Sequence, residues 1–123
     1  MRTLPALTGV LLFSSLAAGP LQAAGDAVRG EALYQSRCIA CHSPDAHRVG
    51  PKHRGVFGRE AGTAEGYDYS PALVASRVVW DETTLDRWLS DPDALIPGQK
   101  MGYRAGSAGD RRDLIAFLRS LSP

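Results

Sequence analysis

Apolar residues recur at helical spacing near both ends of the chain, once the first two dozen residues are set aside. Asp26 stands where a helix cap is needed, and Leu33 and Tyr34 continue an apolar stripe behind it. A second stripe near the end of the chain consists of Leu114, Phe117, Leu118 and Leu121. We therefore predict an N-terminal and a C-terminal helix, each with one buried face.

Gly30 falls inside the first stripe. Glycine in a helix interior costs about 1 kcal/mol relative to alanine, so its presence needs a reason. The missing side chain lets another helix approach closely. We expect the C-terminal helix to cross the N-terminal helix at this residue.

Between these two helices the sequence predicts loops and short helices. Residues 43–66 are rich in Pro, Gly, His and Arg and show no alternation of apolar and polar positions. Ser70 and Pro71 are typical of the cap and first turn of a short helix that ends at residue 75 or 76. Asp81 can cap a further helix that ends at Asp91–Pro92, and an irregular loop at 97–101 follows. These patterns together predict helices joined by loops, with no strand pattern in the loop at residues 43–66.

The first 24 residues resemble a secretory signal peptide. Arg2 supplies a positive end, residues 4–18 form an apolar run with small residues, and cleavage is expected after Ala23 or Ala24. The run is short and rich in Ala and Ser for a membrane span, and retention as an uncleaved anchor is the alternative. We divide the chain into a signal peptide, residues 1–24, and one domain, residues 25–123.

Charge is balanced in the expected mature chain, since loss of Arg2 leaves 13 basic residues against 13 acidic ones. Nucleic-acid binding needs a concentrated basic face, and the sequence suggests none. A domain of roughly a hundred residues has a marginal apolar core. A buried cofactor would supply apolar volume that the few aliphatic residues after Ala24 do not provide.

The strongest chemical signal is the pattern Cys38-x-x-Cys41-His42, which is typical of covalent haem attachment. Residues three and four apart share a face of a helical turn. Cys38 and Cys41 can therefore reach two vinyl groups on one porphyrin edge, with His42 below the iron. A redox disulfide and a zinc site are the alternatives; the first lacks a βαβ context and the second lacks two further ligands.

A haem iron with one histidine ligand needs a sixth ligand or leaves that position open. Met101 is the only methionine after the signal segment, and the loop before it could wrap around the second haem face. His53 is a competitor, whereas His47 follows His42 too closely to reach the opposite face. We favour Met101, with His53 or an open position as the alternatives.

With these motifs in place, the chain resembles the class I cytochromes c, closest to mitochondrial cytochrome c and its soluble bacterial relatives. The resemblance covers nearly all of the expected mature chain. Its markers are Cys38-x-x-Cys41-His42, Gly50-Pro51, residues 55–59, Gly66-Tyr67-x-Tyr69-Ser70, Trp80, Pro97-Gly98-x-Lys100-Met101 and residues 112–118.

The resemblance implies a small all-α globule whose N- and C-terminal helices cross over a covalently bound haem. Gly30, Tyr34 and Phe117 match the positions of that crossing. Pro51 matches the proline whose carbonyl accepts a hydrogen bond from the ligand histidine. The residues matching those that hydrogen-bond a buried haem propionate are Arg59, Tyr69 and Trp80. Lys100 matches a lysine beside the methionine ligand.

The chain departs from the mitochondrial pattern in and around the haem pocket. His53 stands where those relatives have leucine, and Leu73 and Trp88 replace an asparagine and a tyrosine of a buried water network. The loop from His42 to Pro51 is three residues shorter. The docking ring of lysines is absent, because Lys52 and Lys100 are the only lysines.

These features predict an electron carrier rather than an enzyme: a soluble periplasmic monohaem cytochrome with one covalent haem c, exported across the inner membrane. We expect a monomer with no small-molecule substrate and no nucleic-acid partner. Its redox partners would be a respiratory or photosynthetic complex, an oxidase or a periplasmic dehydrogenase. A dedicated cytochrome subunit of a periplasmic oxidoreductase, or an open-site haem enzyme or gas sensor, are the alternatives.

Overall fold

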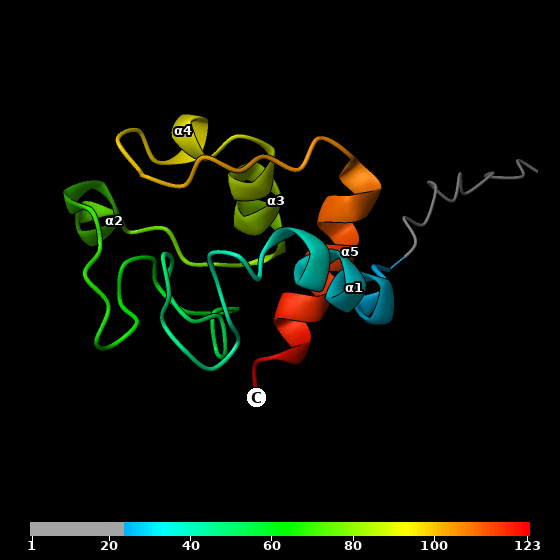
Figure 1. The fold of residues 1–123 in the computed structure, drawn as a ribbon. Helices are drawn as coiled ribbons and strands as arrows, with labels where there is room; N and C mark the ends of the chain where they lie inside the picture. Colours follow the sequence, from blue (N-terminus) through cyan, green and yellow to red (C-terminus); the bar gives the residue numbers. More distant parts are fainter. Residues whose placement is uncertain (1–23) are drawn as a thin grey trace, which may run out of the picture.

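The computed structural model describes residues 24–123, so the expected signal peptide lies, apart from residue 24, outside the described residues. None of the helices in the described part of the chain is long and apolar enough to cross a membrane. Residues 24–123 form helices and loops with one isolated β-bridge, which agrees with the predicted all-α fold (Figure 1). The helices are α1 (Ala27–Arg37), α2 (Pro71–Ala75), α3 (Glu82–Ser90), α4 (Pro92–Leu95) and α5 (Ala108–Ser120).

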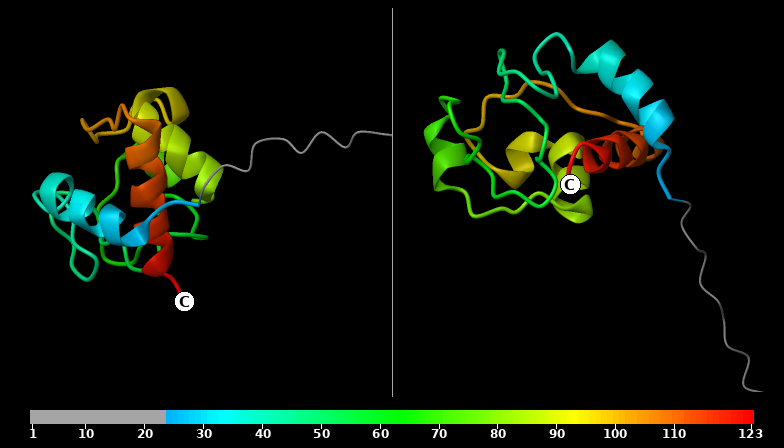
Figure 2. Two further views of the ribbon diagram at one scale, coloured as in Figure 1. Left: turned by 90° about the vertical axis from the view of Figure 1, so that its right-hand side faces the viewer. Right: turned by 90° about the horizontal axis from the view of Figure 1, so that it is seen from below.

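Helices α1 and α5 cross at close range, as predicted (Figure 2). A Cβ atom on Gly30 would lie only 1.9 Å from the carbonyl oxygen of Asp113 and 3.0 Å from the Cβ of Phe117. Only glycine permits this backbone approach. The ring of Tyr34 then packs on that of Phe117, with centroids 5.0 Å apart.

Ion pairs reinforce the same crossing. Asp110 is buried and accepts hydrogen bonds from Arg29 at 2.7 Å and from Arg37 at 2.8 Å. Asp113 accepts from the backbone N–H of Asp26 at 2.8 Å and also pairs with Arg29. These contacts lower the pKa of both carboxyl groups below the ordinary value of 3.8.

The predicted helix caps are present in the middle of the chain. The Ser70 hydroxyl accepts from the backbone N–H of Leu73, with Pro71 at the first helical position of α2. Asp81 and Thr84 form a reciprocal capping box at the start of α3.

The sequence interpretation missed helix α4. Asp91 ends α3 as predicted, but it also caps the next turn, where its carboxylate accepts from the backbone N–H of Ala94. Pro92 occupies the first position of this turn, where a helix does not need its N–H. The chain therefore re-enters a helix directly after the break.

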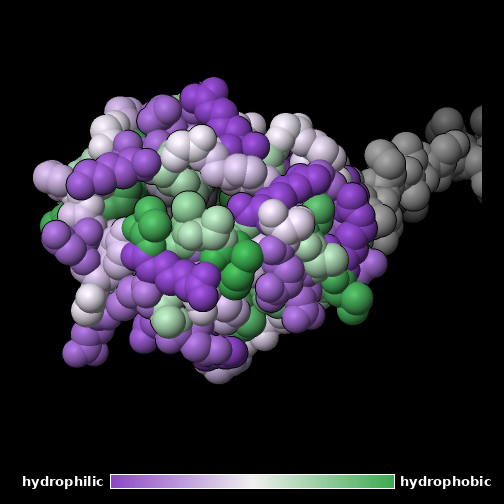
Figure 3. Space-filling view, viewed as in Figure 1, coloured by the Kyte–Doolittle hydropathy of each residue, from purple (hydrophilic) through white to green (hydrophobic). Residues whose placement is uncertain are grey.

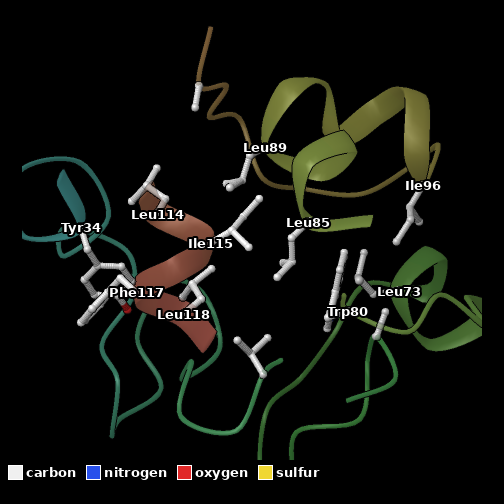
Figure 4. Packing of buried hydrophobic residues seen from close by; sticks show 13 residues of the cluster. Tyr34, Leu73, Trp80, Leu85, Leu89, Ile96, Leu114, Ile115, Phe117 and Leu118 are labelled. Carbon is white, nitrogen blue, oxygen red and sulfur yellow. The ribbon is translucent and has the colours of Figure 1, made fainter. Parts of the chain in front are cut away.

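Buried apolar side chains form one cluster that links α1, α3 and α5 to the intervening loops. Figure 4 shows Tyr34 beside Phe117 at one end of this cluster and Leu73 beside Trp80 at the other. The two groups come from segments far apart in the sequence. The core therefore spans the molecule from the α1–α5 crossing to α2.

Candidate functional site

A large cavity opens into this core. Its volume of about 650 Å³ lies within the range of roughly 300–1,000 Å³ that is typical of cofactor and ligand pockets. Hydrophobic side chains gather at the middle of one face of the molecule, with polar side chains around them (Figure 3). The structure brings every site residue predicted from the sequence to the wall of this cavity: Cys38, Cys41, His42, Pro51, Arg59, Tyr69, Trp80 and Met101.

The cysteine–histidine motif forms a separate turn after α1. Cys38 is the C-cap of that helix, and its carbonyl accepts from the backbone N–H groups of Cys41 and His42 at 3.0 and 2.8 Å. This turn brings both thiols and the imidazole to one cavity wall. The three side chains can therefore act on one planar group in the cavity.

The Cys38 thiol has little of the character of a redox disulfide centre. Both cysteines are unpaired, and burial raises the pKa of Cys38 to about 11. Disulfide exchange is carried out by thiolates, and catalytic cysteines have a depressed pKa for this reason. The environment of Cys38 therefore argues against the disulfide alternative.

His42 is held in one tautomer and one orientation. Its Nδ1–H donates to the carbonyl oxygen of Pro51 at 2.8 Å, so the lone pair of Nε2 is available to a metal. Burial lowers the pKa of His42, which favours the neutral ring that a metal requires. Gly50 makes this arrangement possible, because a Cβ atom there would lie 2.2 Å from Cε1 of the imidazole.

His53 lies against His42. The two rings are stacked, with centroids 4.1 Å apart and planes inclined by 22°. Nδ1 of His53 is hydrogen-bonded to the hydroxyl of Tyr34 at 2.9 Å. Burial, with smaller contributions from His42 and Arg59, holds the pKa of His53 well below its ordinary value of 6.5.

His47 is engaged elsewhere. Its Nε2 is 2.8 Å from the carbonyl oxygen of Glu65, and its Nδ1 accepts from the backbone N–H of Lys52 at 3.1 Å. Both ring nitrogens therefore have protein partners. His47 therefore links Lys52 to Glu65 within the loop that follows His42.

Arg59 and Trp80 become neighbours through a short antiparallel pairing that the sequence interpretation did not predict. The N–H of Trp80 donates to the carbonyl of Arg59 at 2.9 Å, and the bridge Glu60–Val79 follows directly. Tyr69 reaches the same cavity, and its hydroxyl oxygen accepts from the N–H of Ala64 at 3.1 Å. That contact uses an acceptor site, so the phenolic hydrogen can still donate.

Comparisons with known proteins agree with this geometry. Residues 27–122 match the family model for cytochrome c. The chain is 39% identical over 98 residues to cytochrome c of Kluyveromyces lactis, which covers 76% of this chain and 89% of that protein. It is 39% identical over 100 residues to cytochrome c2 of Rhodopila globiformis, covering 79% of this chain and 94% of that protein.

A solved structure of a cytochrome has a similar fold. Cytochrome cH from Methylobacterium extorquens superposes with a TM-score of 0.74 at 40% identity, over 78% of this chain and 99% of that one. The fold and the cavity define a small helical cytochrome. The chain belongs to the cytochrome c family.

Members of the cytochrome c family carry one covalently attached haem c and act as electron carriers rather than enzymes, and the same holds for this protein. The residues present fit this group. The cavity has the volume of a cofactor site, two thiols lie on its wall, and a neutral imidazole beside them offers a nitrogen lone pair.

Two further features of the site were missed by sequence reasoning. One is the contact between His53 and Tyr34, which joins the pocket to the α1–α5 crossing. The other is the side-chain amide of Gln99, which contacts the backbone of Met101. A polar residue two positions before Met101 was the one available signal, and nothing in the pattern indicated its partner.

Proposed function

We propose that this cytochrome is a periplasmic monohaem electron carrier whose haem is attached through Cys38 and Cys41 and ligated by His42 and Met101. The observation that carries the proposal is the hydrogen bond from His42 Nδ1–H to Pro51, which leaves Nε2 as the metal-binding atom. Bound in this way, the haem supplies a one-electron ferrous–ferric couple.

The stacking of His53 on His42 supports Met101 as the second axial ligand. A histidine binds a metal through a nitrogen in the ring plane, so two ligands on opposite haem faces point their ring edges at the iron from opposite sides. Rings stacked at 4.1 Å cannot do this. Met101 remains on the cavity wall as a thioether ligand, which is the His/Met set typical of cytochromes c.

Arg59, Tyr69 and Trp80 are proposed to surround one haem propionate. Two donor groups of the Arg59 guanidinium contact the carbonyls of Arg54 and Lys52 at 3.2 and 3.4 Å. The guanidinium has five N–H donors, so others can reach a carboxylate. Its fixed charge would offset the cost of burying the propionate.

The periplasmic location rests on the N-terminal pattern of Arg2 followed by the apolar run at 4–18. A redox protein of that compartment is the expected partner. Since the expected mature chain carries equal numbers of acidic and basic residues, we propose that contact around the haem edge contributes more to docking than long-range attraction.

A combined experiment tests this function. The gene is expressed in a bacterium with haem-attachment machinery, the cells are fractionated, and the purified protein is titrated potentiometrically. We expect a periplasmic protein that lacks the first two dozen residues, follows a one-electron curve and does not bind carbon monoxide when reduced. Rapid carbon monoxide binding would instead favour an open-site enzyme or sensor.

A further inference from the structure

We propose that Gln99 is a positioning residue that holds Met101 ready to bind the haem iron, an inference that rests on the proposed ligation by Met101. Both residues line the same cavity. Gln99 would keep the ligand loop in place through its side-chain amide, without touching the iron itself. Its role is thus distinct from that of the ligand.

The position of Gln99 is set by a tight turn. Its backbone N–H donates to the carbonyl of Ile96 at 3.2 Å. Pro97 occupies the second position of this turn, and Gly98 occupies the third with a φ of +88°. Proline followed by a residue with positive φ is the requirement of a type II turn, and only glycine adopts that φ without strain. The sequence Pro97–Gly98 therefore fixes the backbone at Gln99.

From this turn the Gln99 amide binds both backbone polar groups of Met101. Nε2 donates to the Met101 carbonyl at 2.9 Å, and Oε1 accepts from the Met101 N–H at 2.5 Å. The second hydrogen of Nε2 goes to Oδ1 of Asp93 at 2.9 Å. Both hydrogens and the oxygen of the amide are therefore used, and the side chain has a single orientation.

The two hydrogen bonds between the Gln99 amide and the Met101 backbone form a clamp. This clamp matters because Met101 lies outside any helix or strand. Its side chain has three rotatable bonds, so a mobile backbone would spread the thioether over many positions. Holding the backbone lowers the entropy lost when sulfur binds iron, which is the usual benefit of a preorganised ligand. Without the clamp, a competing ligand from solution should displace the thioether more easily.

Asp93 gives the clamp a further anchor. Arg104 contacts Asp93 at 3.4 Å and Asp91 at 2.9 Å, which joins the segment after Met101 to α4. These charged side chains are largely exposed, and exposed ion pairs contribute little. The part-buried contacts of Gln99 with Met101 should therefore contribute more to holding Met101 in place than these ion pairs do.

Imidazole titration of the ferric holoprotein tests the inference, because imidazole can bind only after the thioether leaves. Gln99→Leu keeps the approximate size of the side chain and removes all three hydrogen bonds. We expect this variant to bind imidazole about tenfold more tightly than wild type, which corresponds to the loss of one or two hydrogen bonds of ordinary net strength. Met101→Ala sets the upper limit of affinity.

A matched control separates positioning from general loosening of the fold. Asp26→Ala removes the cap of α1, and Asp26 does not line the cavity. This variant should unfold more easily, yet its imidazole affinity should stay within about twofold of wild type. If Asp26→Ala tightens imidazole binding as much as Gln99→Leu does, the effect is general and the inference is wrong.

A charge exchange gives a second test that does not depend on the leucine variant. Gln99→Glu keeps an acceptor for the Met101 N–H but loses both donors and faces the Asp93 carboxylate. It should bind imidazole more tightly than wild type. Adding Asp93→Asn supplies a donor on the other side and should restore part of the wild-type resistance, whereas Asp93→Asn alone should have little effect.

Failure of the ligand assignment and failure of the positioning role give different results. If wild type lacks the absorption band of sulfur–iron ligation, or binds imidazole as tightly as Met101→Ala, the ligand assignment is wrong. If wild type shows the band and resists imidazole, but Gln99→Leu and Gln99→Glu resist it equally well, the ligand assignment stands. The positioning role of Gln99 is then overturned.

Discussion

His53 stacks face to face on His42, with the two imidazole centroids 4.1 Å apart. The planes of the two rings are inclined by 22°, so their faces are in contact. The hydroxyl of Tyr34 in α1 is hydrogen-bonded to Nδ1 of His53. The chain of contacts therefore continues from the proposed ligand His42 into α1. His53 is thus a packing support for His42.

The Tyr34–His53 hydrogen bond should contribute to stability. Tyr34→Phe leaves the partly buried Nδ1 of His53 without its protein partner, and we expect the free energy of unfolding to fall by about 1 kcal/mol in denaturant titrations. The double variant Tyr34→Phe/His53→Leu removes both polar groups and should recover part of this loss. Equal midpoints for wild type and Tyr34→Phe would show that the bond contributes nothing.

Gly30→Ala should disrupt the crossing of α1 and α5. The new methyl group would lie 1.9 Å from the Asp113 carbonyl oxygen, so the helices must move apart, at a cost of about 1–3 kcal/mol. Gly109→Ala in α5 is the matched control, because its nearest neighbour would be the Ser107 hydroxyl at 3.7 Å. Thermal unfolding should show a lower midpoint for Gly30→Ala and an unchanged or higher one for Gly109→Ala.

The ion pairs of the crossing predict a defined acid sensitivity. The pKa of Asp110 is held below 3.8, first by Arg29 and then by Arg37. A carboxyl group whose pKa is lowered by folding stabilises the fold above its unfolded-state pKa, and this contribution disappears as the pH falls through the folded-state value. The thermal midpoint should therefore drop below about pH 4, and it should drop less steeply in Asp110→Asn. Parallel profiles for the two proteins would contradict this.

Most of the fold could be predicted because its signals are local. The caps at Asp26, Ser70 and Asp81 and the break at Asp91–Pro92 each act within a few residues. The crossing at Gly30 was predicted because glycine is unfavourable inside a helix unless a neighbouring backbone needs the space. Helix α4 was missed because four residues are too few to show a hydrophobic period.

Other features of the pocket depend on contacts that spacing does not encode. From the sequence alone, His53 remained an alternative to Met101 as an iron ligand. Only the fold shows that the His53 ring lies against the ring of His42. The pairing of Arg59 with Trp80 joins two segments that have no strand pattern. The contacts of Gln99 depend on a turn and on Asp93 in a different element.

Covalent attachment can be checked on a denaturing gel stained for haem. We expect wild type to stain and the double variant Cys38→Ala/Cys41→Ala to lose the stain, because thioether bonds survive denaturation and axial ligation does not. Met101→Ala is the control and should stain like wild type. A colourless wild-type band, with the haem extracted by acid acetone, would contradict attachment through these thiols.

The absorption spectrum of the ferric protein tests the proposed ligand pair most directly. Wild type should show the weak long-wavelength band of sulfur–iron ligation, and Met101→Ala should lose it and bind carbon monoxide when reduced. His53→Leu should keep the band, because His53 lies against His42 and not opposite it. Loss of the band in His53→Leu together with its survival in Met101→Ala would contradict the account.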